Sequence, residues 1–128
     1  MQNVIIDTEV AIDFLKGKDY AKEFLPALLQ CNSAYMRSLS VYELHAGMRD
    51  NEITKTNDFI NACHIELVTM DIAIKAGEIK RNYKAKGITL TSIDCLIATT
   101  ALIYKLKIAT RNKNHYPDKS LLLEFEIF

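Results

Sequence analysis

Short apolar runs alternate along this chain with longer segments of helical spacing, and this alternation restricts the possible folds more than any other feature. The runs cover residues 3–6, 33–39, 65–69 and 106–110 and are apolar along most of their length. Such runs are typical of strands buried on both faces, as in a parallel sheet covered by helices. The chain is therefore predicted to have an α/β fold of three layers (α/β/α) around a central parallel sheet of four or five strands. The fifth strand is predicted over residues 125–128.

Helices are expected between and after these strands, because apolar residues recur there at intervals of three and four. Gly17 and Gly87 are expected just beyond two helix ends, and Asp71 and Thr91 are expected N-caps. Pro26 falls inside a helical segment and predicts a kink or a weaker helix. The last helix is the most apolar, so we expect it to be buried on nearly all sides. The predicted helices cover residues 8–16, 20–30, 40–48, 54–63, 71–86 and 93–104.

Size and composition indicate an ordinary globular protein. The 128 residues are 49% hydrophobic and 25% charged, which fits a single domain spanning residues 1–128. No run of about 18 apolar residues is present, so no membrane-spanning helix is expected. The first residues lack the basic start of a signal peptide, and the expected location is cytoplasmic. Cys31, Cys63 and Cys95 form no CxxC pair, so we expect reduced thiols in or near the core, without disulfides or a zinc site.

Three acidic residues stand at equivalent places relative to the predicted strands. Asp7 follows the first strand directly, Glu43 lies in the first turn of the helix after the second strand, and Asp94 heads the very apolar helix. The carboxyl ends of parallel strands share one edge of a sheet, and ligands bind there. Carboxylates brought together repel each other unless a cation joins them, and an all-oxygen site selects Mg²⁺ or Mn²⁺. The sequence therefore predicts a magnesium or manganese site at this edge.

Each acid also has a purely structural explanation. Asp7 is a favourable N-cap for the following helix. Glu43 stands three residues after Ser40, which is the spacing of a capping box. Asp94 in a first helical turn is favoured by the helix dipole. Each of these explanations is sufficient for one residue. To account for all three acids without a metal site, however, all three explanations must hold at the same edge of the sheet.

Charge is distributed unevenly along a chain of zero net charge. Residues 1–74 hold 6 Lys or Arg against 11 Asp or Glu, whereas residues 75–119 hold 10 against 3. This asymmetry is compatible with a protein that holds a metal with one region and phosphates with another. The alternative is that charges separated along the chain are mixed in space.

Four motifs follow one another in order over residues 4 to about 117, and each alone is weakly specific. A hydrophobic strand ends in Asp7-Thr8, and a serine is followed three residues later by Glu43-Leu44. An aspartate heads a Leu-Ile-Ala-rich helix at Asp94, and a strand leads into Thr110-Arg111-Asn112 and the pair His115-Tyr116. These motifs resemble those of the PIN-domain family, and more closely its bacterial VapC-like toxin branch.

The resemblance implies roles for individual residues. Asp7, Glu43 and Asp94 match the catalytic, metal-binding acids, and Thr8 matches a position that often supports the first of them. Asn112 stands where many members have a further Asp, and it can offer a neutral carbonyl oxygen or hold a water. Its neutrality leaves less charge for a second metal ion, which puts a two-metal site in doubt.

The resemblance also implies an activity and partners. Proteins of the VapC-like branch are metal-dependent endoribonucleases, form homodimers and are held inactive by a cognate antitoxin. RNA binding beside an acidic pocket requires nearby cations, and Arg111 is the preferred candidate because it precedes Asn112. His115 is a further candidate for contact with a phosphate or a water, against the alternative of a surface histidine.

Two other functions are compatible with the sequence. One is a different magnesium-dependent phosphotransfer enzyme with an aspartyl nucleophile, although the haloacid dehalogenase-like pattern needs an Asp where this chain has Glu9. The other is a non-catalytic PIN-like binding domain, for which Asn112 is the supporting feature. Metal-dependent cleavage of RNA distinguishes the proposed nuclease from a binding domain.

Overall fold

One parallel sheet of four strands forms the centre of the computed structural model, which describes residues 1–127. The strand order is β3-β2-β1-β4, so β1 lies between its sequence neighbour and the last strand. Val4 of β1 is paired with Ala34 of β2 on one side and with Lys107 of β4 on the other. The predicted parallel α/β fold is confirmed. The strands are β1 (Val4–Ile6), β2 (Ala34–Arg37), β3 (His64–Glu66) and β4 (Lys107–Ala109).

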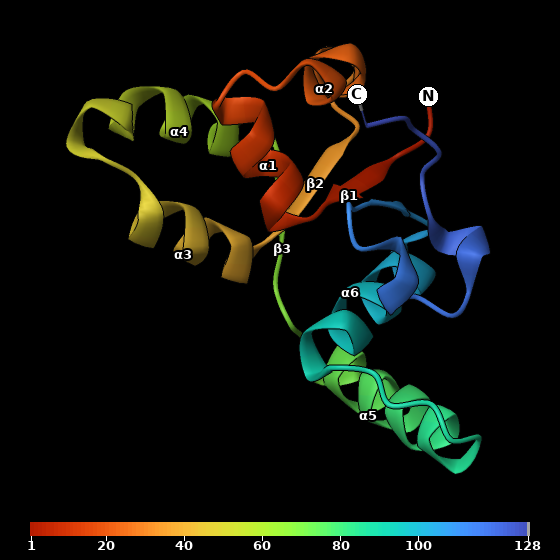
Figure 1. Cartoon of the computed structure of the whole chain (residues 1–128). Coiled ribbons are helices and arrows are strands. Elements are labelled where there is room, and N and C mark those ends of the chain that lie inside the picture. The colour runs from red at the N-terminus through yellow and green to blue at the C-terminus, as the bar shows by residue number, and fades with distance from the viewer. Residues whose placement is uncertain (128) are drawn as a thin grey trace.

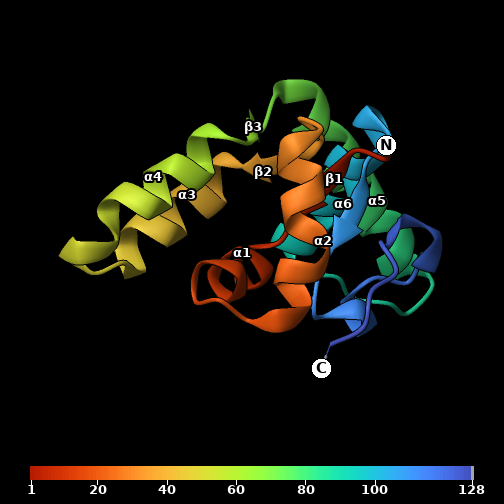
Figure 2. The ribbon, with the colours of Figure 1, turned by 90° about the horizontal axis from the view of Figure 1, so that it is seen from above.

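Helices cover both faces of this sheet, as expected for three layers (Figure 1). On one face, α1 and α2 pack against Val4 and Ile6 of β1. On the other face, α6 packs against Ile5, and α5 lies along α6. The pair formed by α3 and α4 projects to one side of the sheet (Figure 2). The helices are α1 (Thr8–Leu15), α2 (Asp19–Gln30), α3 (Ser38–Gly47), α4 (Ile53–Asn61), α5 (Met70–Ala85) and α6 (Ser92–Tyr104), with short 3-10 turns at Asp50–Glu52, Lys113–His115 and Lys119–Leu121.

The predicted fifth strand is absent from residues 125–127, and Phe128 lies outside the described residues. Instead, Leu122 makes an isolated parallel bridge with Ile108 at the edge of β4. Phe125 then stacks on Tyr20 and Phe24 of α2, with ring centroids 5.8 and 4.8 Å apart. The aromatic side chain thus gains more by packing over a helix than by extending the sheet.

Several element boundaries differ from the predicted ones for local reasons. Ser38 and Leu39 are helical, so β2 ends at Arg37. Thr69, and not Asp71, caps α5, because its hydroxyl accepts a hydrogen bond of 3.2 Å from the backbone N–H of Ile72. Helix α2 continues through the exposed Pro26 to Gln30.

The predicted burial was wrong at two places. Helix α6 is not buried on nearly all sides, since Ile93 and Leu102 are 45% and 47% exposed. Its apolar sequence therefore reflects one core face and one open apolar face. The three cysteines are free as expected, but Cys31 at the end of α2 is exposed, whereas Cys95 is buried. No helix within residues 1–127 is both long enough and apolar enough to cross a membrane.

Candidate functional site

An open cleft of about 300 Å³ lies where the carboxyl ends of the central strands meet the first turns of α1 and α6. The three predicted acids all line it, although they come from three separate elements. Thr8, Asn112 and His115 line it as well. The complete lining is Asp7, Thr8, Glu9, Arg37, Glu43, Thr91, Ile93, Asp94, Asn112 and His115.

Asp7 directly follows β1 and is the N-cap of α1. Its Oδ1 accepts a hydrogen bond of 2.9 Å from the backbone N–H of Thr8, and its Oδ2 accepts one of 3.0 Å from the Thr110 hydroxyl. Its own N–H donates to the carbonyl of Ala109, which ties the end of β1 to the end of β4. Asp7 therefore caps a helix and also presents an oriented carboxylate to the cleft.

Glu43 does not belong to a capping box with Ser40. Helix α3 begins at Ser38 with Arg37 as its N-cap, so Ser40 is inside the helix and Glu43 lies beyond its first turn. The hydroxyl of Thr8 lies 2.8 Å from Ser40 Oγ and 3.1 Å from Glu43 Oε1. The hydroxyl of Thr8 therefore supports Glu43, and the Asp7 carboxylate receives its hydroxyl donor from Thr110.

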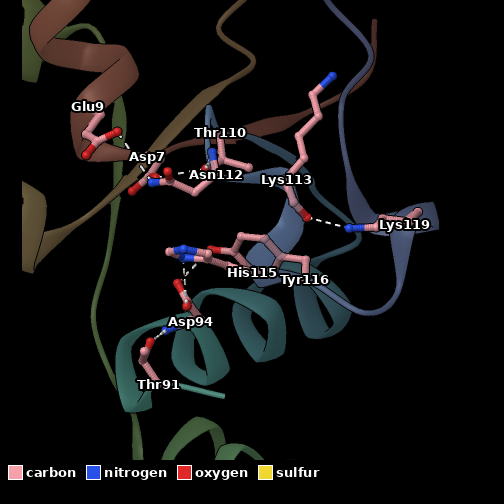
Figure 3. A network of polar contacts seen from close by, with 10 residues as sticks. All are labelled: Asp7, Glu9, Thr91, Asp94, Thr110, Asn112, Lys113, His115, Tyr116 and Lys119. Atoms are coloured by element: carbon pink, nitrogen blue, oxygen red, sulfur yellow. Dashed lines mark hydrogen bonds and ion pairs between the residues drawn. The ribbon is translucent and has the colours of Figure 1, made fainter. Parts of the chain in front are cut away.

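Asp94 lies in the first turn of α6 and is held by three groups. Its backbone N–H donates to the hydroxyl of the N-cap Thr91 at 3.1 Å. Its Oδ1 accepts a hydrogen bond of 3.4 Å from the hydroxyl of Tyr116, and His115 Nδ1 lies 3.3 Å from Oδ2. Figure 3 shows Asp94 pointing from α6 toward His115 and Tyr116, with Asp7, Glu9 and Asn112 on the opposite side of the site.

Tyr116 is buried behind Asp94 and is a packing residue of the α6 face. Burial raises the pKa of its hydroxyl far above the ordinary value, and the negative charge of Asp94 raises it further. The hydroxyl therefore remains protonated at pH values near neutrality and keeps donating its hydrogen bond to Asp94.

Asn112 closes the cleft from the loop after β4. Its backbone N–H donates to the Thr110 hydroxyl at 3.0 Å, and its side-chain Nδ2 donates to Glu9 Oε2 at 3.4 Å. Glu9 is thus a fourth acid of the cleft that the sequence reasoning did not include. The available signal was the position of Glu9 in the first turn of the helix that follows Asp7.

Arg111, unlike His115, is absent from the cleft lining. Its Nη1 forms an ion pair of 3.2 Å with Asp13, which also accepts a short hydrogen bond from Tyr20. Arg111 lines an adjoining hollow together with Asn112 and His115. The predicted basic residue therefore lies beside the acidic cleft.

Arg37 is the second cleft residue that the sequence reasoning missed. It is the last residue of β2 and only 6% exposed. The available signal was a charged residue in the middle of a segment that was predicted as a buried strand.

The donor set of this cleft fits a hard divalent cation. Carboxylates and a neutral amide are the groups that Mg²⁺ and Mn²⁺ prefer, and there is no thiolate among them. Within residues 1–127, no three His, Cys, Asp or Glu side chains stand close enough together to surround one ion. Mg²⁺ commonly keeps several waters and takes only one or two carboxylates directly, so an open acidic cleft is compatible with it.

Fold and cleft together define a class: a parallel α/β protein with acids from three elements at the carboxyl edge of its sheet. The family model for the PIN domain matches residues 4–117, and the chain belongs to the PIN-domain family. It is 34% identical over 114 residues to Ribonuclease VapC19 of Mycobacterium tuberculosis, which covers 88% of this chain and 91% of that protein. It is 29% identical over 114 residues to Ribonuclease VapC10 of the same organism, covering 89% and 86%.

Solved structures share the fold. A chain in the crystal structure of VapBC2 from Rickettsia felis bound to a DNA fragment from their promoter superimposes with a TM-score of 0.81, at 20% identity over 98% of this chain and 100% of that one. A chain in a toxin-antitoxin complex from Klebsiella pneumoniae gives 0.79, at 22% identity over 95% and 97%. The likeness extends over nearly the whole chain in both cases.

Proposed function

We propose that this chain is an endoribonuclease that hydrolyses RNA phosphodiesters with Mg²⁺ or Mn²⁺, and that it acts as the toxin of a toxin–antitoxin pair. One observation carries the proposal: Asp7, Glu43 and Asp94 line the same open cleft although 87 residues separate the first from the last. The name of the relative that is 34% identical, a ribonuclease, supports the same activity.

Asp7, Glu43 and Asp94 would hold the metal ion, which when bound supplies a Lewis acid for the phosphate and makes a water more acidic. Thr110 and Tyr116 orient the carboxylates of Asp7 and Asp94 by donating hydrogen bonds to them. In the hydrolysis, a water oxygen forms a bond to phosphorus while the bond to a ribose oxygen breaks, and that oxygen leaves as a hydroxyl. No side chain of the chain serves as the nucleophile.

The roles of Thr8 and Asn112 are to support this site. The Thr8 hydroxyl contacts Glu43 and restricts its side chain. Asn112 contributes a polar oxygen without a further negative charge. An Asp at this position would add one more carboxylate that repels an approaching RNA phosphate.

An antitoxin and a second copy of this chain are the proposed protein partners. A small apolar groove of about 170 Å³ runs between α1, α3 and α4 and reaches Glu43 at the rim of the cleft. We assign it to the cognate antitoxin, because a segment bound there would lead directly to the acids. Ile12, Leu15, Leu44 and Met48 supply its apolar wall.

The direct test is incubation of the purified chain, freed of co-purifying protein, with total bacterial RNA in Mg²⁺, in Mn²⁺ and in EDTA. The Asp94→Asn variant removes a carboxylate from the cleft, and Asp58→Asn on the exposed surface of α4 is the matched control. We expect discrete fragments from the wild type and from Asp58→Asn, and none with EDTA or with Asp94→Asn. Folded wild-type protein that binds RNA without cutting it in either metal would favour the non-catalytic binding domain.

A further inference from the structure

Arg37 is the only lysine or arginine that is buried within residues 1–127, and it lies in the acidic cleft. Burial of a charged group is unfavourable unless a partner compensates it, and buried arginines are ordinarily paired with carboxylates. Carboxylates are abundant here, because Asp7, Glu9, Glu43 and Asp94 line the same cleft. A structural arginine in this position would be expected to bind one of them.

Arg37 does not do so. The ion pairs of the described residues join Lys75 with Glu78, Arg111 with Asp13 and His115 with Asp94, and no hydrogen bond of the described residues involves the Arg37 side chain. No fully enclosed side-chain nitrogen or oxygen in that part of the chain lacks a hydrogen-bond partner. The unpaired guanidinium nitrogens of Arg37 must therefore each keep some accessible surface, and the space they line is the cleft.

The direction of the side chain follows from the strand. Arg37 is two residues after Tyr35, so both point to the same face of the sheet, and Tyr35 packs in the cluster under α6. Asp94, in the first turn of α6, lines the same cleft as Arg37. The guanidinium therefore lies on the α6 side of the cleft.

We propose that Arg37 is a catalytic residue whose guanidinium contacts the non-bridging oxygens of the scissile phosphodiester. This inference rests on the proposed ribonuclease function. A guanidinium presents several N–H groups in a planar fork, which matches two oxygens of one phosphate. Four carboxylates alone would repel an RNA backbone, so a cation fixed among them gives the phosphate a defined place opposite the metal-holding acids.

The competing role is compensation of the cleft's negative charge, in which Arg37 would act only on the carboxylates. The two roles predict different measurements. An arginine that neutralises carboxylates changes their affinity for a cation, whereas one that contacts phosphate changes cleavage at a constant metal affinity. The experiment therefore measures both quantities on the same proteins.

The variants are Arg37→Gln, Arg37→Lys and Arg37→Ala, with Arg81→Gln on the exposed surface of α5 as the control for loss of one positive charge. The substrate is an RNA oligonucleotide that spans a site mapped in the digest of total RNA. Single-turnover cleavage is measured at saturating protein over a series of Mn²⁺ concentrations that reaches saturation, and Mn²⁺ affinity is measured by calorimetry. Thermal unfolding reports whether each variant is folded.

We expect Arg37→Gln to slow cleavage by about 100-fold or more, as removal of other transition-state donors does, with Mn²⁺ affinity within about twofold of the wild type. Arg37→Lys should recover only part of the rate, because an ammonium lacks the planar fork. Millimolar guanidinium should restore part of the Arg37→Ala activity and leave Arg81→Gln unchanged.

Cleavage by Arg37→Gln within about threefold of the wild type would overturn the assignment, as would recovery of its rate by raising Mn²⁺ alone. If the Gln variant does not fold, Arg37→Lys and the guanidinium rescue decide in its place. A wild-type chain that cleaves no RNA overturns the proposed function together with this inference, whereas a wild type that cleaves and an Arg37 variant that cleaves equally well overturn this inference alone.

Discussion

Thr110 donates a hydrogen bond of 3.0 Å from its hydroxyl to Asp7 Oδ2, and this bond links the residues that directly follow the adjacent strands β4 and β1. The hydroxyl oxygen of Thr110 in turn accepts a hydrogen bond of 3.0 Å from the backbone N–H of Asn112. Thr110 is 1% exposed, so water does not compete for these bonds. One buried hydroxyl thus positions both the Asp7 carboxylate, directly after β1, and Asn112 in the loop that closes the cleft.

Replacement of Thr110 by valine keeps the volume of the side chain and removes this hydroxyl. Asp7 then loses one of its two donors, and the N–H of Asn112 loses its acceptor. We expect the free energy of unfolding to fall by about 1–3 kcal/mol, measured by urea denaturation. RNA cleavage should slow by about 10- to 100-fold, as for other residues that orient metal ligands.

Two controls separate these effects of Thr110→Val. Thr110→Ser retains the hydroxyl and should retain most of the activity. Thr100→Val removes a hydroxyl that bonds to the Leu96 carbonyl inside α6, so it should alter stability without altering cleavage. Equal activity of the Thr110→Val variant and the wild type would show that Asp7 does not need the hydroxyl donor from Thr110.

The parts of the fold that were predictable from the sequence are those encoded locally. The four strands are apolar runs, and Asp7 and Asp94 could be placed because each directly adjoins an element boundary that the pattern defines. Thr8 and Asn112 were placed in the cleft by their order in the motifs. Glu43 also lines the cleft, although α3 starts earlier than predicted because Arg37 takes the N-cap position.

The parts that were not predictable depend on the strand order. The contact between Thr110 and Asp7 exists because β4 is inserted beside β1, and hydrophobic periodicity does not encode which strands are neighbours. Arg37 was counted within an apolar run, and only the position of β2 next to β1 brings it into the cleft. The final segment was predicted as a strand because nothing local to it signals that Phe125 stacks over α2.

The stability of the protein at high pH should depend on the ionisation of its two buried tyrosines. Burial raises the pKa of Tyr20 and Tyr116 above the ordinary value of 10.0, and Asp13 and Asp94 raise them further. Their contribution to stability is complete below pH 10 and is lost above it, because the unfolded chain then releases protons that the folded chain retains. Urea denaturation from pH 8.5 to 11 should therefore show stability falling with pH.

Tyr116→Phe should make that decline shallower, since one of the two responsible groups is removed. Tyr42, which is 67% exposed, supplies the control, and Tyr42→Phe should leave the slope unchanged. An identical slope in the wild type and in Tyr116→Phe would show that Tyr116 ionises equally in both states.

Thiol alkylation should distinguish the three cysteines in the folded protein. Cys31 is exposed, whereas burial raises the pKa of the Cys63 thiol to about 12 and also raises that of Cys95. The thiolate is the nucleophile, so iodoacetamide at pH 8 should modify Cys31 alone until the chain unfolds. Mass spectrometry of the wild type and of Cys31→Ser checks this, and native modification of Cys63 would contradict the burial.

Arg111 should influence RNA binding through its charge rather than through the chemistry of the cleft. Its side chain is 45% exposed and lies beside the cleft, paired with Asp13. If it meets one backbone phosphate, Arg111→Ala should reduce the slope of log affinity against log salt by about 0.7, the value for one contact to a single strand. Because the Arg111 side of the pair is open to solvent, stability should change by only about 0–1 kcal/mol.

Asp13→Asn provides the matched comparison, since it weakens the same ion pair but leaves the charge of Arg111 in place. The salt slope of this variant should equal or exceed that of the wild type, because an arginine released from Asp13 is freer to meet a phosphate. If both variants reduced the slope equally, the loss would come from a disturbed loop after β4. An effect of Arg111→Ala alone would instead assign the contact to the guanidinium, at a place outside the acids that are proposed to hold the metal.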